Sequence, residues 1–133
     1  MSSDRPVEDL EDLLAGVDPA RRPGEFVFVT VDTPADIPGG AAATVVEDGR
    51  VSCVVEVEVA LTRGQAAEPR LAWITLRVHS SLTAVGLTAA VAGALSSRGI
   101  AANVIAGHRH DHVLVPVDRA DEAVAAITAL AQR

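Results

Sequence analysis

Residues 71–99 read LAWITLRVHSSLTAVGLTAAVAGALSSRG, and this stretch decides the fold. From Ala72 to Val78, small and branched apolar side chains alternate with Trp, Thr and Arg, which predicts a β-strand with one buried face. Beyond it, Leu87, Val91 and Leu95 recur every four residues, as the core-facing side chains of an α-helix do. The stretch therefore predicts a strand followed by a helix.

The chain beyond this helix predicts two more strands. We expect the helix to begin at Thr83 or Val85 and to stop at Gly99, since glycine readily adopts the left-handed conformation found after helix ends. Strands are predicted at residues 100–106 and 112–117, with a polar turn between them.

A second helix is predicted at the end of the chain. Asp118 is a suitable N-cap for it, and its buried stripe is expected to consist of Ala123, Val124, Ile127 and Leu130. The order of elements is then strand, helix, strand, strand, helix. Completed by one strand from the first half of the chain, this order predicts the α+β class, with a ferredoxin-like sheet and both helices on one face.

The first half of the chain is predicted to supply that additional strand. A short helix is expected at residues 7–16, and a loop at residues 18–24, which are rich in Pro and Arg. Alternating Val and Phe predict a strand at residues 25–31. Asp48-Gly49 is a strong signal for the turn of a β-hairpin. Residues 56–64 fit either a strand or a short helix.

The composition argues against several classes of protein. The net charge is −7 and the chain has one Trp, two Phe and no Tyr, so it lacks the basic stripe and stacking rings of nucleic-acid-binding proteins. No apolar run approaches the roughly 20 residues of a membrane span, and the acidic start lacks the apolar segment of a signal peptide. The single cysteine, Cys53, suits a reducing compartment. We therefore predict a cytoplasmic protein that binds neither nucleic acid nor membranes.

Four segments of the second half resemble a known family. They are WITLRVHSSL at 73–82, AVGLTAAV at 84–91, RGIAANVIAG at 98–107 and HDHVLVP at 110–116. In these segments the chain resembles a bacterial family of small, largely uncharacterised ACT-domain proteins, related to the paired ACT domains of aspartokinases and amino-acid sensors. The resemblance implies two ACT-like halves packed together, an N-terminal half at residues 1–68 and a C-terminal ACT domain at residues 69–133.

The resemblance also implies a binding site for an amino acid at an interface between two domains. Some of the matching positions lie at the start of the first helix of the second half, and the others on the next strand, contributed by a neighbouring domain. These positions are Val85, Gly86, Leu87, Asn103, Val104 and Ile105.

Elementary chemistry supports part of this site. A helix start offers unpaired N–H groups to an α-carboxylate, Gly86 lets a ligand approach the backbone, and Asn103 can both donate and accept hydrogen bonds. ACT effector sites often carry Asp or Asn before a glycine at the helix start, whereas the loop at residues 80–86 has no carboxylate for an ammonium group. The alternative is that Gly86 only permits close helix packing and that Asn103 satisfies a turn or a sheet edge.

Three histidines, His108, His110 and His112, alternate in the segment GHRHDH. On a strand they would share one face, which is a plausible arrangement for a metal. A tight turn would break this alternation, and further ligands are missing downstream. The other interpretation is a polar β-hairpin in which Asp111 orients a histidine and the imidazoles line a dimer contact or the rim of the effector pocket.

We predict a non-enzymatic regulatory module that binds an amino acid, needs no cofactor or resident metal, and forms a homodimer. Cys53 lies among valines and is expected to be buried and inert, and the chain has neither a lysine for Schiff-base chemistry nor a nucleophile elbow. Two alternatives remain open. One is a metal-binding protein or metal-dependent enzyme that uses the histidines at 108–112, and the other is a structural protein whose exposed surfaces serve oligomerisation.

Overall fold

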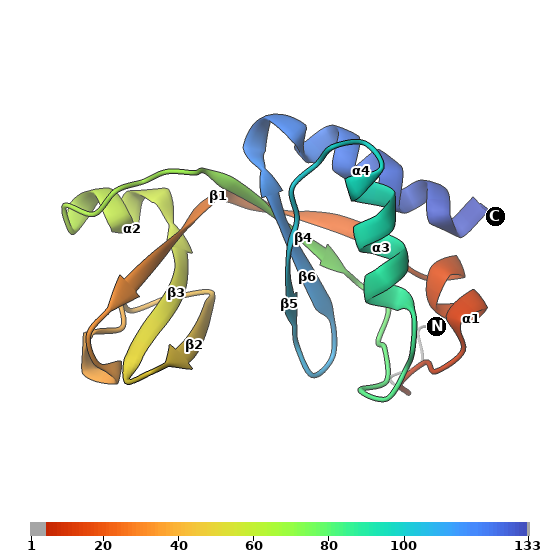
Figure 1. The fold of residues 1–133 in the computed structure, drawn as a ribbon, viewed down its shortest axis with the longest axis horizontal. Helices are drawn as coiled ribbons and strands as arrows, with labels where there is room; N and C mark the ends of the chain where they lie inside the picture. Colours follow the sequence, from red (N-terminus) through yellow and green to blue (C-terminus); the bar gives the residue numbers. More distant parts are fainter. Residues whose placement is uncertain (1–4, 133) are drawn as a thin grey trace. The chain divides into compact units, whose positions relative to one another are not determined.

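A computed structural model describes residues 5–132 (Figure 1). Contacts divide the chain into two compact units. The larger unit contains the residues up to Pro23 together with those from Ala72 onward, and the smaller unit contains Gly24–Leu71. Among the helices described, none has the length and apolar character needed to cross a membrane.

The larger unit has the order of elements that the sequence predicts. These elements are α1 (Leu10–Ala15), β4 (Leu71–Leu76), α3 (Leu87–Ser96), β5 (Asn103–Ala106), β6 (Asp111–Pro116), η2 (Val117–Arg119), α4 (Ala120–Thr128) and η3 (Ala129–Gln132). The first half of the chain supplies the additional strand, since β1 (Pro19–Val31) lies beside β4. Because β1 also enters the smaller unit, the hydrogen-bonded strand order is β2-β3-β1-β4-β6-β5. The predicted α+β class and ferredoxin-like arrangement are confirmed.

One hydrophobic core holds the helices of the larger unit against its sheet. Alternate residues of β4 face this core, and β6 adds Val113 and Val115. Trp73, on the opposite face of β4, is also buried, so the prediction of a single buried face is wrong. Figure 1 shows α3 and α4 together on one side of β4, β5 and β6. The side chains that meet in this core include Ala72, Ile74 and Leu76 from β4, Leu87, Val91 and Leu95 from α3, and Ala123, Ala126 and Ile127 from α4.

The smaller unit is built on a β-hairpin followed by a short helix. Its elements besides β1 are η1 (Pro34–Asp36), β2 (Ala43–Glu47), β3 (Arg50–Glu56) and α2 (Val57–Thr62). Asp48 and Gly49 have φ of 48° and 82°, which confirms the predicted hairpin turn. The ambiguous segment at residues 56–64 is mainly helical, and Gly64 follows the helix with φ of 68°.

Valines from β1 and β3 form a second core in the smaller unit, and Cys53 belongs to it as predicted. Val29 of β1 pairs directly with Cys53 of β3. Burial raises the pKa of the Cys53 thiol above its ordinary value, with Arg63 acting in the opposite direction. The thiol is therefore protonated near neutral pH, and this residue packs as a small apolar side chain.

The predicted loop at residues 18–24 is wrong, because β1 begins at Pro19. Arg77 fixes the chain just before this strand. Its backbone N–H donates to the carbonyl oxygen of Asp18 at 3.2 Å, and its guanidinium donates to both carboxylate oxygens of Asp18 at 2.9 and 3.0 Å. Long-range pairing thus overrides a local composition rich in turn-forming residues.

The predicted helix ends need correction at three places. The first helix begins at Leu10 rather than residue 7, because the Asp9 carboxylate accepts a hydrogen bond from the N–H of Asp12 at 3.2 Å and acts as its N-cap. The helix α3 begins at Leu87 rather than at Thr83 or Val85, since Gly86 precedes it with φ of 108°. Asp118 is not an N-cap, because it lies inside η2 and α4 begins at Ala120.

Leu95 provides a direct test of this core. Its side chain is fully buried, whereas Leu82 is 74% exposed. We expect Leu95→Ala to lower the free energy of unfolding by about 2–5 kcal/mol and Leu82→Ala to change it by less than about 0.5 kcal/mol. Urea unfolding followed by circular dichroism measures both, and equal effects of the two substitutions would contradict the core described above.

Candidate functional site

The candidate site is an open cavity of about 600 Å³ in the larger unit. It lies between the loop that precedes α3, the first turns of α3, and the facing ends of β5 and β6. Its lining residues are Ser80, Ser81, Leu82, Ala84, Val85, Gly86, Leu87, Thr88, Ala89, Ala92, Ala106, Gly107 and Asp111. Within this set Asp111 is the one ionisable side chain, so a single carboxylate dominates the charge of the wall.

Three of the six predicted ligand-binding residues, Val85, Gly86 and Leu87, line this cavity. Val85 is 82% exposed, whereas Leu87 turns into the core and is buried. Gly86 precedes the helix and offers no side chain to cap it. The first intrahelical hydrogen bond runs from the N–H of Ala90 to the carbonyl oxygen of Gly86. The N–H groups of the helix residues before Ala90 therefore have no acceptor within the helix.

The reason for a glycine at position 86 differs from the expected one. A Cβ at this position would lie 3.1 and 3.3 Å from the two terminal methyl carbons of Leu10 in α1. Its φ of 108° also falls in the region that other residues rarely adopt. Gly86 is therefore required by the backbone bend and by the packing of Leu10, rather than by a ligand that approaches its Cα atom.

The other three predicted residues, Asn103, Val104 and Ile105, are outside this lining. Val104 packs against the core, and Asn103 is exposed on β5, the last strand in the sheet order. Ile105 pairs with His112 of β6. Within one chain, the structure therefore does not bring this group together with the helix start.

Asp111, the ionisable residue of the lining, is not among the predicted ligand-binding residues. It begins β6 opposite Ala106, is 9% exposed and lines the cavity. Burial raises the pKa of its carboxyl above the ordinary value, while His112 and His110 act in the opposite direction. The signal in the sequence was a carboxylate at the edge of a predicted strand, close to a glycine. The loop before α3 lacks a carboxylate, but the hairpin supplies one from the opposite wall.

The histidines of the hairpin do not form a metal site. Within residues 5–132, no three side chains of His, Cys, Asp or Glu are arranged to hold a metal ion. His108 lies on the exposed turn, and the Nδ1 atom of His110 lies 3.3 Å from the carbonyl oxygen of Val78. The rings of His110 and His79 meet edge to face with their centres 6.5 Å apart.

His112 belongs to a chain of hydrogen bonds on the sheet face opposite Asp111. The indole N–H of Trp73 donates to the Thr75 hydroxyl oxygen at 3.0 Å, and the same oxygen lies 3.0 Å from Nδ1 of His112. Because this hydroxyl already accepts one bond, its own hydrogen is available to Nδ1, which favours a neutral imidazole. The His112 ring also packs on Trp73 with ring centres 4.9 Å apart.

The electrostatics of His112 agree with this assignment. Burial lowers the pKa of its imidazole below the ordinary value, and His110 and Arg22 act in the same direction, whereas Asp111 opposes them. The guanidinium of Arg22 lies 5.3 Å from the centre of the Trp73 ring. The surroundings of His112 therefore hold it neutral near pH 7.

The fold and the cavity at a helix start define the class of protein. An ACT-domain family model matches residues 69–129 and a second ACT-domain model matches residues 5–69. The chain therefore belongs to the ACT-domain family and contains two ACT domains. None of the curated proteins is significantly similar to it in sequence.

Among solved structures, the chain is similar to VC0802 from Vibrio cholerae, a protein of unknown function described as a possible transport protein. The two are 41% identical over 87% of this chain and 91% of that chain, with a TM-score of 0.80. The fold is also similar to the regulatory subunit of aspartate kinase from Thermus flavus, at 16% identity over 84% and 95% of the two chains and a TM-score of 0.61. Atu0741 from Agrobacterium tumefaciens shares the fold at 16% identity over 81% and 84%, with a TM-score of 0.57.

The buried, neutral state of His112 predicts how stability depends on pH. In the unfolded chain His112 binds a proton near its ordinary pKa of about 6.5, whereas in the folded chain its pKa is lower, so acidification favours unfolding. We expect the wild-type protein to lose more unfolding free energy between pH 7.5 and pH 5.5 than the His112→Gln variant. Urea unfolding at both pH values measures the difference, and equal losses in the two proteins would contradict it.

Proposed function

We propose that this protein is a non-enzymatic regulatory module that binds a free amino acid in the cavity between α3 and Asp111. The observation that carries the proposal is that one wall of the cavity favours a negatively charged group and the facing wall favours a positively charged one. The start of α3 presents N–H donors and the positive end of the helix dipole, while the facing wall presents the buried carboxylate of Asp111. A zwitterion with a carboxylate at one end and an ammonium group at the other satisfies both.

The helix start suits the α-carboxylate of such a ligand. α3 has ten residues, no acidic side chain in its first turn and no side-chain cap, so an incoming anion meets no repulsion there. Ser81 and Thr88 add hydroxyl groups to the same part of the lining. Carboxylate recognition by backbone donors does not depend on the side chain of the ligand, as a sensor of amino acids requires.

Asp111 suits the ammonium group. Its raised pKa shows that burial disfavours the ionised carboxylate in the empty cavity. An ammonium group beside it supplies the missing positive charge, and the charge-assisted hydrogen bond is stronger than a neutral one. The energy that the empty protein loses through this buried carboxylate is thus recovered when an amino acid binds.

The side chain of the ligand would lie among small residues. Ala89, Ala92, Ala106 and Gly107 line the cavity, and its volume of about 600 Å³ lies within the range of small-molecule sites. These residues leave room and offer no further charge. They support an uncharged amino acid as the ligand.

We also propose that the protein forms a homodimer, which would give a role to the three predicted ligand-binding residues outside the cavity. Asn103, Val104 and Ile105 lie on β5, at the end of the sheet order, where a second copy of the chain could place them against a neighbouring site. We also propose that the boundary between the two ACT domains lies between residues 68 and 69. The fold shared with an aspartate kinase regulatory subunit supports a regulatory rather than a catalytic role.

A thermal-shift screen tests the proposed function. Each of the twenty amino acids is added at about 10 mM, and the melting temperature is compared with that of the protein alone. A ligand present at 100 times its Kd stabilises the folded state by about 2.7 kcal/mol, which raises the melting temperature by several degrees. A flat response to all twenty would contradict the proposal, as would equal shifts by the amino acid and by the 2-oxo acid that lacks its ammonium group.

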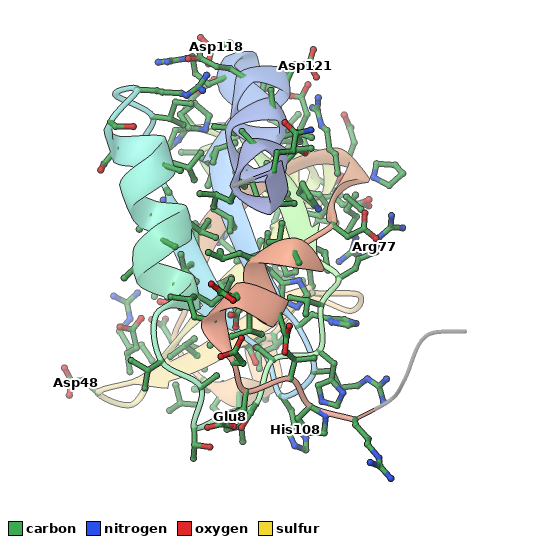
Figure 2. The ribbon with its side chains drawn as sticks, turned by 90° about the vertical axis from the view of Figure 1, so that its right-hand side faces the viewer. Glu8, Asp48, Arg77, His108, Asp118 and Asp121 are labelled. Atoms are coloured by element: carbon green, nitrogen blue, oxygen red, sulfur yellow. The ribbon has the colours of Figure 1, made fainter. Side chains whose placement is uncertain are left out.

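Asp111→Asn separates ligand binding from folding. Without ligand we expect this variant to be at least as stable as the wild-type protein, because it removes a carboxylate whose ionised form is disfavoured by burial. Its response to amino acids should fall by tenfold or more in affinity, since a neutral amide pairs poorly with ammonium. Asp118→Asn is the matched control, because Asp118 is exposed and lies at the end of the larger unit remote from Glu8 and His108 (Figure 2). Unchanged binding by Asp111→Asn would exclude its proposed role.

A further inference from the structure

The loop that lines the cavity is held by a segment near the N-terminus of the chain. We call residues 79–86 the rim loop and Val7–Leu10 the strap. The N–H of Val7 donates to the carbonyl oxygen of His79 at 2.6 Å, and the N–H of Ser81 donates to the carbonyl oxygen of Val7 at 2.8 Å. These two bonds form a parallel bridge in which the strap adds a short edge to the rim loop.

A side-chain contact fixes the middle of the rim loop. The Thr83 hydroxyl donates to the two carboxylate oxygens of Glu8, which lie at 3.0 and 3.2 Å. The N–H of Thr83 in turn donates to the Ser81 hydroxyl oxygen at 3.2 Å. Glu8 is exposed and lies on the segment that leads into α1 (Figure 2). Its carboxylate therefore holds the loop in place without itself lining the cavity.

Leu10 fixes the last residue of the rim loop. Its methyl groups cover the face of Gly86 that a side chain would otherwise occupy, as close as 3.1 Å from the position of a Cβ. Leu10 is also the first residue of α1, whose Leu13 is fully buried in the core, as is Val17 just beyond the helix. The strap is thus anchored at its C-terminal end and reaches over the rim loop from there.

We propose that the strap positions the rim loop, and that docking of the strap and binding in the cavity stabilise each other. The rim loop carries no regular helix or strand, so contacts from outside it set its conformation. Ser80, Ser81, Val85 and Gly86 line the cavity from this loop, and a displaced strap would release all of them. By linkage, any occupant that needs the ordered loop strengthens docking of the strap by the same factor. The amino-acid nature of this occupant rests on the proposed function, whereas the role of the strap does not.

Hydrogen exchange of the ligand-free protein tests the positioning role. In Glu8→Ala/Leu10→Ala, we expect the Ser81 amide, which donates to Val7, to exchange about tenfold faster or more. Glu11→Ala is the matched control, because Glu11 is an exposed acidic residue of α1 outside the strap. The Ile100 amide, which donates to Leu95, should exchange at the wild-type rate in both variants and reports that the core remains folded. Thr83→Val removes the Glu8 contact from the other partner and should also accelerate exchange at Ser81.

The coupling is tested with the wild-type protein, Glu8→Ala/Leu10→Ala and Glu11→Ala, and with the panel of twenty amino acids at about 10 mM. We take the amino acid that stabilises the wild-type protein most. Compared with the wild-type protein, we expect it to bind Glu8→Ala/Leu10→Ala about tenfold more weakly and Glu11→Ala equally well. In the wild-type protein it should slow exchange of the Ser81 amide. If the Ser81 amide of the double variant exchanges at the wild-type rate, the strap does not position the rim loop. If the double variant binds the amino acid with undiminished affinity, docking of the strap is not coupled to binding in the cavity. A flat panel for the wild-type protein would count against the effector function, and exchange at Ser81 would then decide the positioning role by itself.

Discussion

The left-handed backbone at Gly86 is the constraint on which the candidate site depends. This bend turns the chain from the rim loop into α3, so the uncapped first turn of the helix borders the cavity. Because glycine has no side chain, position 86 supplies no cap to these N–H groups, and the same absence leaves a surface that Leu10 covers. One residue therefore keeps the helix start open to a ligand and gives the strap its contact.

Side-chain periodicity is the part of the sequence that predicted the fold. Alternation along β4 and the four-residue spacing of Leu87, Val91 and Leu95 each identify side chains that share one face, and these two faces meet in one core. Asp48-Gly49 could be assigned because a two-residue turn needs positive φ at both positions. These signals are local, since each depends on what a single element must bury or on how a single turn must bend.

The errors arose where distant residues decide the conformation. Residues 19–24 belong to β1, and Arg77, remote in sequence, holds Asp18 just before this strand. Asp111 was missed as a site residue for a related reason: the side of the sheet to which a strand residue points depends on the register of its hairpin, which the sequence does not specify alone. The start of α3 was predicted as part of the site, since the family pattern marks it. The position of the Asp111 carboxylate opposite the helix start could be recognised only from the folded structure.

Asp111 and His112 connect the cavity with the other face of the sheet. As successive strand residues they point in opposite directions, and burial moves their pKa values in opposite senses because it disfavours the charge of each. Each ionised form would stabilise the other, so protonation of His112 competes with an external cation for the same carboxylate. An ammonium group bound in the cavity, as proposed, would pair with Asp111 directly and weaken its stabilisation of a protonated His112, which would stay neutral and bonded to Thr75. Under the proposed function, an occupied cavity would therefore keep the hydrogen-bonded chain that ends at Trp73 intact to a lower pH.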